Sequence, residues 1–317
     1  MDALSDVIKA AQLSGGVFLH AEFRAPWCLR DELDASLCDP FLKPVTSLIH
    51  YHFVVEGEMR VQVEGQEELI ARAGDLVLFP HNAKHLLGSD LSLPPVVGDS
   101  VVRKPEKGGL YWIEHGGDGE TTRMVCGYLG SEGIEDNPVL NGLPPVILLG
   151  VEQGGSAEWI RSTFQRAADE VSTSRPGSAT VLAKLSELLF VEAVRRYLED
   201  IPEEETGWLA GLKDPYVSQV LALVHGDVRR SWTVDALGRE VGLSRSALAE
   251  RFGRLIGISP IQYVGRWRMQ VAAQKLRTTN HSMLQIADMV GYESEAAFSR
   301  AFKKAYGKPP ATWRREC

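Results

Sequence analysis

The chain is poor in the features that mark exported, disulfide-bonded or membrane proteins. Its 317 residues include only 4 cysteines, Cys28, Cys38, Cys126 and Cys317. No segment has the roughly 20 consecutive apolar residues that a membrane-spanning helix needs. The first twelve residues contain no basic region followed by an apolar run, so no secretory signal is predicted. We therefore expect a cytoplasmic protein with reduced thiols and no membrane partner.

The short motifs of several common catalytic folds are also missing. The sequence contains no nucleophile elbow, no P-loop and no dinucleotide-binding glycine fingerprint. These absences argue against the best-recognised hydrolases, nucleotidases and dehydrogenases. A protein that binds and regulates, and is not an enzyme, is the simpler expectation.

Positive charge is scarce overall, with 34 Lys and Arg against 42 Asp and Glu and a net charge of −8. The distribution along the chain is uneven. Residues 215–317 hold 16 Lys and Arg and 8 Asp and Glu, a net charge of +8, whereas the remainder holds 18 and 34, a net charge of −16. Such asymmetry favours a nucleic-acid-binding half joined to a half with another task, although charge also varies along chains without functional meaning.

The first half of the chain predicts short β-strands. Apolar and polar residues alternate from Met59 to Val63, and Gly65 supplies a turn. The run Leu76–Phe79 is apolar throughout and has turn residues on both sides. Residues 89–109 are rich in Pro, Gly and Ser and predict a long surface loop. Short strands separated by turns are typical of a sandwich or jelly roll.

Helical periodicity begins near Ser178. Apolar residues then recur at three- and four-residue spacing: Val181, Leu182, Leu185, Leu188, Leu189, Val194 and Leu198. This stripe could pack on the β domain or pair with its copy in a homodimer, and both interpretations stay open. A charged segment follows, so we place residues 1–200 in an N-terminal domain, 201–213 in a linker and 214–317 in an all-α domain.

The all-α domain contains an internal repeat, and each copy has the pattern of a helix-turn-helix motif. The two copies cover residues 233–257 and 282–307. Each has a capping signal, a short amphipathic helix, a glycine for the turn (Gly242 or Gly291) and a second helix. Residues 261–277 predict one long helix between the copies. A helical bundle that binds protein is the alternative, but duplication within a basic segment favours DNA.

Residues 216–315 resemble the DNA-binding domain of the AraC/XylS family of bacterial regulators. The resemblance is strongest over Ile286–Ser294, Phe298–Lys304 and Gly307–Pro310. It implies two recognition helices that enter successive major grooves about 34 Å apart. It also implies that the N-terminal halves of these helices face base edges, through Arg245, Ser246, Ala249, Glu250, Glu295, Ala296, Ser299 and Arg300. Phosphate contacts would come from Arg251, Arg254, Lys303 and Lys304.

The N-terminal half resembles the cupin-like sensor domains of AraC-family regulators, which implies a β jelly roll. His50, His52 and Glu56 fit the first cupin motif. The segment from Gly74 to His85 fits the second, with Asn82 in place of its usual glycine.

The two motifs also suggest a metal site. His50 and His52 would point to the same side of a strand, and the resemblance implies that His85 and Glu56 join them. Three imidazoles and a carboxylate suit Zn or another divalent transition metal. Two alternatives stay open: a small organic effector in the barrel, or histidines that are only hydrogen-bonded within it.

Three cysteines suggest a redox hypothesis. Cys28, Cys38 and Cys126 could sense oxidants if their thiols had a low pKa and formed a disulfide. The alternative is that they are small buried hydrophobic residues.

The sequence therefore predicts a DNA-binding transcription regulator that responds to a small-molecule, metal or redox signal. Its partners would be double-stranded DNA, a second copy of the chain, an unidentified effector and, for an activator, RNA polymerase. The competing hypotheses are a metal-dependent cupin enzyme with a DNA-binding appendage and a non-enzymatic protein-binding module.

Overall fold

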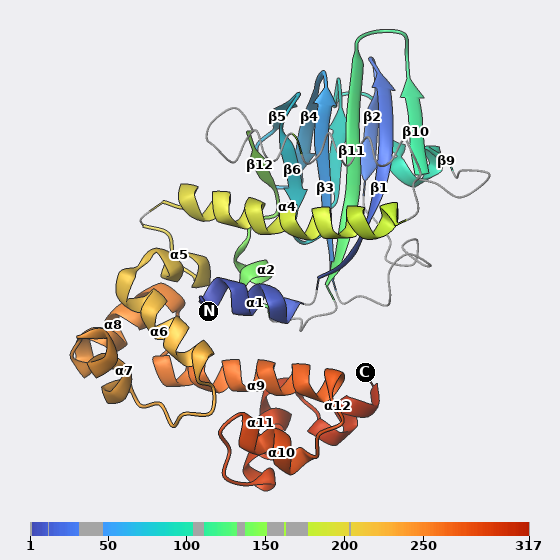
Figure 1. The fold of residues 1–317 in the computed structure, drawn as a ribbon. Helices are drawn as coiled ribbons and strands as arrows, with labels where there is room; N and C mark the ends of the chain where they lie inside the picture. Colours follow the sequence, from blue (N-terminus) through green and yellow to red (C-terminus); the bar gives the residue numbers. More distant parts are fainter. Residues whose placement is uncertain are drawn as a thin grey trace. The chain divides into compact units, whose positions relative to one another are not determined.

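The computed structural model describes residues 2–11, 13–31, 47–103, 111–131, 137–150, 162, 177–202 and 204–316. These residues form two compact units (Figure 1). The β unit comprises Leu13–Glu132 and Leu143–Glu199. The helical unit comprises Met1–Gln12, Gly133–Gly142 and Asp200–Cys317. None of the helices in the described part is long and apolar enough to cross a membrane.

The described strands of the β unit form two sheets. The seven-stranded sheet runs in the order β12 (Ile147–Leu149), β6 (Leu76–Phe79), β3 (Ser47–Glu56), β11 (Thr121–Ser131), β1 (Leu13–Arg24), β10 (Tyr111–Gly116) and β9 (Val102–Arg103). The five-stranded sheet runs in the order β5 (Leu69–Arg72), β4 (Glu58–Val63), β7 (His85–Gly88), β2 (Cys28–Asp31) and β8 (Val96–Val97).

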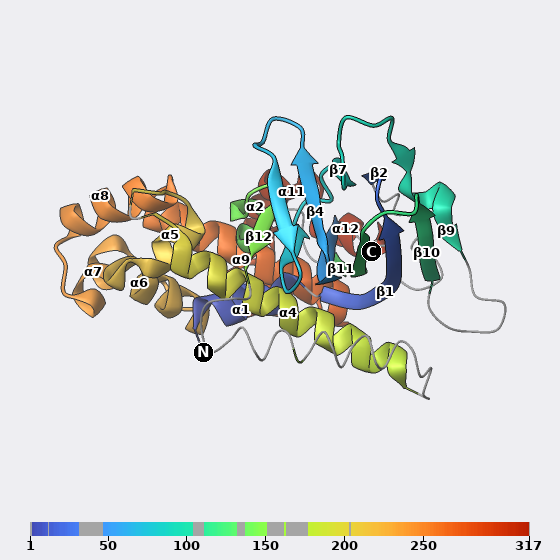
Figure 2. The ribbon, with the colours of Figure 1, turned by 90° about the horizontal axis from the view of Figure 1, so that it is seen from above.

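The two sheets, whose strands are seen from above in Figure 2, enclose one hydrophobic core. Phe23 and Val54 enter it from the larger sheet, and Met59 and Leu87 enter it from the smaller one. The alternation predicted from Met59 to Val63 is confirmed, because the apolar members are buried. This alternation gives β4 one apolar face to pack against the opposite sheet, as in a sandwich or jelly roll.

The prediction of a long loop over residues 89–109 is wrong for residues 96–103, and residues 104–109 lie outside the described residues. Residues 96–103 contain β8, a short 3-10 helix (Gly98–Val101) and β9. β8 adds to β2 in parallel, and β9 pairs with β10 in antiparallel register. These strands are two residues long, so they carry no periodic signal in the sequence.

The helix expected from Ser178 is α4 (Ser178–Asp200). Its buried face includes Leu189, Phe190 and Val194. The Tyr51 hydroxyl on β3 and the Ser186 hydroxyl on α4 form a buried hydrogen bond of 2.9 Å. α4 therefore packs on the β unit. This is the first of the two interpretations that the sequence left open for its apolar stripe.

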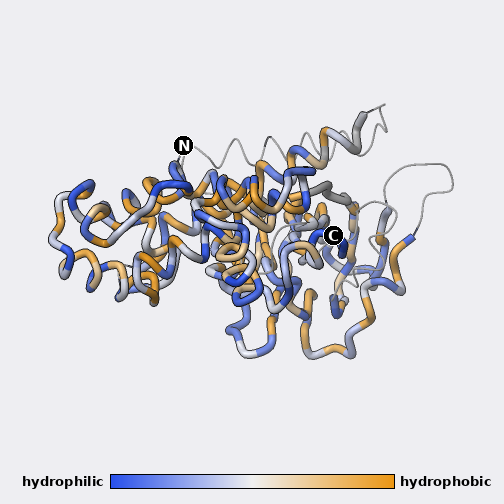
Figure 3. The backbone as a smooth tube through the Cα atoms, turned by 90° about the horizontal axis from the view of Figure 1, so that it is seen from below, coloured by the Kyte–Doolittle hydropathy of each residue, from blue (hydrophilic) through white to orange (hydrophobic). Residues whose placement is uncertain are grey.

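The helical unit contains two helix-turn-helix motifs joined by a long helix. Its described helices are α1 (Ala3–Ala11), α2 (Pro138–Gly142), α5 (Trp208–Lys213), α6 (Pro215–Gly226), α7 (Val234–Val241), α8 (Arg245–Ile256), α9 (Pro260–Thr278), α10 (Met283–Met289), α11 (Glu295–Tyr306) and α12 (Pro310–Glu316). Helices α7 and α8 form the first motif, and α10 and α11 form the second. Hydrophobic and hydrophilic residues alternate along these helices, as expected for amphipathic elements (Figure 3).

Local signals place the helix ends where the sequence predicts them. The Thr233 hydroxyl accepts a hydrogen bond from the backbone N–H of Ala236 and caps α7. Ser282 and Gln285 form a complete capping box at the start of α10. Gly242 and Gly291 have φ of 73° and 76°, which a residue with a side chain rarely adopts. Each side-chain N-cap, from Thr233 or from Ser282, contributes about 1 kcal/mol of stability.

The structure divides the chain differently from the predicted boundary. Helices α1 and α2 precede residue 200 but belong to the helical unit. The side-chain amide of Asn137, at the start of α2, donates to the backbone carbonyl of Val7 on α1 at 3.1 Å. The predicted linker is helical from Trp208, whose buried Nε1–H donates to the Tyr263 hydroxyl at 2.7 Å. A buried tryptophan therefore fixes the second part of the segment that was predicted as a linker.

Candidate functional site

The first recognition helix presents its predicted base-reading residues to solvent. Arg245, Ser246, Ala249 and Glu250 are all exposed on α8. Leu248 and Phe252 lie on the opposite face and are fully buried. Arg245 forms an ion pair of 3.4 Å with Asp235 of α7, but its side chain remains 72% exposed. The face of α8 that carries the predicted residues is therefore available to a large partner.

The second recognition helix repeats this arrangement. Glu295, Ala296, Arg300 and Lys303 are exposed on α11, and Ser299 is partly exposed. Phe298 and Phe302 anchor the helix in a core with α9 and α10. Each motif buries two apolar residues on one face of its second helix, and each therefore exposes its predicted base-reading residues on the opposite face.

Arg251 differs from the other predicted phosphate ligands. Its Nε–H donates to the Asp214 carboxylate at 2.6 Å, and its guanidinium lies 4.9 Å from the ring of Tyr216. These contacts tie α8 to the start of α6. Arg254, Lys303 and Lys304 are exposed, as a phosphate contact requires.

A second candidate site lies inside the β unit. The side chains of His50, His52, His85 and Asp31 converge, and one possible ligand atom from each lies within 4.8 Å of the others. His52 Nε2 is 3.4 Å from His85 Nε2. The nearest carboxylate oxygen of Asp31 is 3.9 Å from His50 Nε2 and 4.0 Å from His52 Nε2. The cluster combines β3, β7 and β2, and so draws on both sheets.

Burial keeps the three imidazoles neutral. It lowers the pKa of His50 to about 3 and that of His85 to about 4. Burial likewise lowers the pKa of His52 far below its usual value, helped by the two neighbouring histidines. Neutral imidazole is the form that binds a metal ion.

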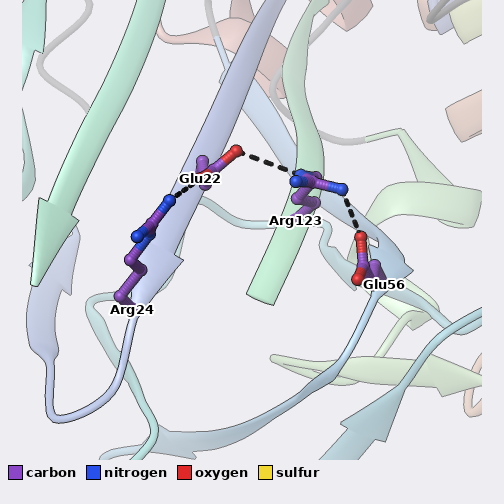
Figure 4. Close-up of polar contacts among 4 residues, drawn as sticks. All are labelled: Glu22, Arg24, Glu56 and Arg123. Carbon is purple, nitrogen blue, oxygen red and sulfur yellow. Dashed lines mark hydrogen bonds and ion pairs between the residues drawn. The ribbon is translucent and has the colours of Figure 1, made fainter. Parts of the chain in front are cut away.

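Glu56 lies outside this cluster, contrary to the predicted ligand set. Residue pairing between β3 and β11 shifts between Met124↔Val54 and Arg123↔Glu56, so Val55 is an extra residue on β3. Such a bulge moves the next side chain to the other face of the sheet. Glu56 is 54% exposed and forms an ion pair with Arg123 (Figure 4).

The outer face of the larger sheet holds Glu56 in an ion-pair network. Arg123 Nε–H donates to Glu22 at 3.0 Å, and Arg24 donates to Glu22 at 3.3 Å (Figure 4). The side-chain hydrogen bonds from both arginines lower the pKa of Glu22. Glu56 therefore has a cationic partner, Arg123, on the surface and lies away from the interior cluster.

Asp31 takes the position that Glu56 was expected to fill. It pairs directly across the strands with His85, and its side chain is only 18% exposed. The sequence contained a weak signal for this residue. Leu29 and Asp31 are two apart on a strand, so they share a face, and Leu29 belongs to the core.

The donor set fits a transition-metal ion. A tetrahedral zinc ion with bonds of about 2.0–2.1 Å keeps its donor atoms about 3.3 Å apart. Three of the six donor separations are 3.4–4.0 Å and all are within 4.8 Å, so the side chains would have to move closer together to reach this geometry. His85 Nδ1 lies 2.7 Å from the Ala83 carbonyl, so it carries the proton and leaves Nε2 for the metal.

The cavity beside the cluster is small. Its volume is about 60 Å³, and Asp31, His50 and His52 of the cluster line it, together with apolar residues such as Phe23 and Leu87. A space of this size suits an ion with one or two water molecules better than an organic ligand. Asn82, which replaces the glycine of the cupin motif, has φ of 49° and so keeps a glycine-like backbone in the turn before His85.

The described cysteines are buried thiols. Burial raises the pKa of Cys28, and it raises the pKa of Cys126 well above its usual range. Both thiols are free, and Cys126 Sγ lies 2.9 Å from His52 Nδ1. A raised pKa disfavours the thiolate that oxidant sensing requires. Cys38 lies outside the described residues.

Comparison with known proteins gives the family. Residues 2–199 match the family described as Cupin, and residues 237–316 match the family described as Helix-turn-helix domain. An AraC-like transcription regulator of Streptomyces lividans is 34% identical over 99% of this chain and 98% of that protein. The chain belongs to the family of AraC-like transcription regulators. The predicted family, fold class and DNA-binding function are therefore confirmed.

One further relative matches over the whole length of this chain, and one solved structure matches its DNA-binding domain. The HTH-type transcriptional regulator MtrA of Neisseria gonorrhoeae is 28% identical over 100% of this chain and 99% of its own. Among solved structures, the DNA-binding domain of AdpA in complex with a target DNA is 27% identical, covering 32% of this chain and 92% of that chain with a TM-score of 0.31.

Proposed function

We propose that this regulator reads two DNA half-sites, one with each recognition helix, and that it acts on DNA in the cytoplasm. The exposure of equivalent positions on α8 and α11 supports this assignment. Arginine pairs bidentately with guanine, glutamate accepts a hydrogen bond from cytosine, and small residues contact the thymine methyl group. Arg245, Arg300 and Glu295 would supply the polar contacts.

Selection from a random double-stranded DNA library tests this proposal. The full chain should enrich one motif with two conserved blocks, and Arg300→Ala should lose the preference in one block only. Enrichment of a motif with a single block, or of no motif, would contradict the two-helix assignment.

We further propose that a divalent transition metal, with Zn as the first candidate, is the effector. The neutral imidazoles of His50, His52 and His85, the carboxylate of Asp31 and the small cavity support a metal over an organic ligand. These four residues would hold the ion, which on binding would draw strands of the two sheets together.

The connections of the chain offer a route from this site to the DNA-binding helices. Leu13 pairs with Ser131 where β1 begins and β11 ends. α1 ends two residues before β1, and α2 begins soon after β11. Both helices belong to the helical unit, so a shift in this strand pair is passed along the chain to α1 and α2.

Metal analysis joined to DNA binding tests the effector proposal. The purified chain should hold about one equivalent of metal after exposure to Zn²⁺ and dialysis. Its affinity for the selected DNA should change at least fivefold when a chelator removes the metal. A chain that holds no stoichiometric metal, or equal affinities with and without metal, would contradict the proposal.

We propose that the regulator is a homodimer without catalytic activity. Val181 and Leu188 lie seven residues apart on α4 and are 42% and 45% exposed, which supports a helix contact between two copies. The whole-length relatives are transcription regulators, which supports a binding role for the metal over a catalytic one. Sedimentation of Leu188→Asp should give monomers where the wild-type chain gives dimers.

A further inference from the structure

Helix α9 packs against both helix-turn-helix motifs. In its first half, Trp267 stacks on His225 of α6 with ring centroids 3.7 Å apart. In its second half, Met269 and Leu276 lie in one core with Phe302 of α11. The helix passes from one core to the other between Trp267 and Met269. The relative orientation of the two motifs therefore depends on the contacts that α9 makes between Trp267 and Met269.

Arg268 lies at this crossover and binds backbone on both sides. Its Nε–H donates to the Val228 carbonyl at 3.1 Å, and Nη2 donates to the Arg230 carbonyl at 2.9 Å and to the Arg229 carbonyl at 3.4 Å. Its Nη1 donates to the Gly291 carbonyl at 3.1 Å. Residues 228–230 lead into α7 of the first motif, and Gly291 forms the turn of the second.

The two turns meet closely around this guanidinium. A side chain on Gly291 would place its Cβ 2.6 Å from the Arg229 carbonyl oxygen and 2.6 Å from Arg268 Nη2. The Arg229 side chain forms an ion pair of 2.7 Å with Asp288 of α10. The Arg268 guanidinium carbon also lies 5.8 Å from the ring of Tyr292. The loop before α7 and the turn after α10 are thus held against each other.

We propose that Arg268 is a positioning residue that fixes α11 relative to α8 and so sets the spacing between half-sites that the regulator accepts. This proposal rests on the reading of DNA by both recognition helices. A planar guanidinium carries five N–H donors in a rigid fork, so it can hold carbonyls of two separate segments at once. A lysine in its place has three donors on one compact ammonium group and does not reproduce this fork.

Binding-site selection with variants tests the proposal on DNA. The wild-type chain should enrich sites in which two blocks stand at one spacing. Arg268→Met and Arg268→Lys should enrich the same two blocks at several spacings, with the preference for the wild-type spacing reduced at least fivefold. Arg266→Met is the matched control, because Arg266 is exposed on the same helix. It should keep the wild-type spacing.

The result that overturns the proposal is a folded Arg268 variant with the wild-type spacing preference, whether or not its affinity falls. Folding is checked for both variants by circular dichroism and thermal melting. Arg268→Lys keeps the positive charge and serves as the test if Arg268→Met does not fold.

A distance measurement tests the same claim without DNA. Spin labels on unnatural residues introduced at Glu250 of α8 and Ser299 of α11 report the separation of the recognition helices. The distribution of distances should be narrow in the wild-type chain and at least twice as wide in Arg268→Lys. Equal widths in the two proteins would overturn the proposal even if no selected motif were known.

Discussion

Single residues decide which carboxylate faces the barrel interior. Asp31 and Glu56 both lie at strand ends, but the register between strands directs one inward and the other outward. Asp31 pairs across the strands with His85, whereas the bulge at Val55 turns Glu56 toward Arg123. The two residues are therefore a natural test pair for the metal proposal.

Asp31→Asn should weaken zinc binding about tenfold or more, because a neutral amide is a poorer ligand than a carboxylate. Glu56→Gln is the control and should bind zinc as the wild-type chain does. Competition with a chromophoric chelator measures both affinities. Equal losses in the two variants would remove Asp31 from the ligand set.

Arg300 is the exposed arginine at the predicted reading face of α11. We expect Arg300→Ala to weaken binding to the selected DNA site by about 1–3 kcal/mol, and to leave non-specific binding nearly unchanged. Gel-shift titrations on specific and scrambled duplexes measure the two affinities.

Lys304→Ala should weaken binding to both duplexes equally, since a phosphate contact carries no sequence information.

His225 makes the helical unit sensitive to acid. Burial lowers its pKa to about 3, against about 6.5 in an unfolded chain. Between these values the unfolded state binds a proton that the folded state does not, so stability falls as the pH drops below 6.5. At pH 5 the loss amounts to about 2 kcal/mol.

Urea unfolding at pH 7 and pH 5 measures this loss. His225→Phe keeps the stack on Trp267 but cannot be protonated. The difference in unfolding free energy between pH 7 and pH 5 should therefore be smaller in the variant than in the wild-type chain, by most of the roughly 2 kcal/mol attributed to His225. A variant with an unchanged difference would show that His225 is not the titrating group.

At the scale of elements, α1 and α2 are structural parts of the DNA-binding half. Val7 of α1 is fully buried, and the backbone of α1 accepts a hydrogen bond from Asn137 at the start of α2. Val7→Asp would bury an unpaired charge at a cost of about 3 kcal/mol or more. It should lower the melting temperature and the affinity for DNA together.

Lys9→Ala is the matched control on the same helix, because Lys9 is exposed. Thermal melting and gel-shift titration of the two variants measure the effect. If Val7→Asp melts and binds DNA as the wild-type chain does, α1 contributes nothing to the helical unit.

Local elements were predictable from the sequence, and long-range partners were not. Thr233, Gly242 and the Ser282–Gln285 capping box act within a few residues, so the sequence alone placed both helix-turn-helix motifs. Asp31 enters the histidine cluster through its pairing with a strand more than fifty residues away, and its two-residue spacing from Leu29 indicates only that it faces the core. The bulge at Val55 and the packing of α1 are equally non-local, and both were missed.

For the whole molecule, the uneven charge predicts how binding responds to salt. Residues 215–317 carry a net charge of +8 within a chain of −8. Phosphate contacts release counterions, so raising NaCl from 50 to 200 mM should weaken binding about 10³-fold if six phosphates are contacted. The double variant Lys303→Ala and Lys304→Ala should reduce the slope of log affinity against log salt by about two. An unchanged slope would exclude both lysines from the backbone contacts.

The helical unit gathers three separate stretches of chain, and this limits how such regulators can be recombined. A hybrid cut once near residue 200 would join a foreign α1 and α2 to the native recognition helices, and would lose the buried fit around Val7. The β unit consists of two stretches, Leu13–Glu132 and Leu143–Glu199, on either side of α2. A functional chimera would need both stretches grafted, with four junctions: one after α1, one on each side of α2 and one before residue 200. Exchange of sensing specificity between relatives is therefore expected to follow four crossovers, not one.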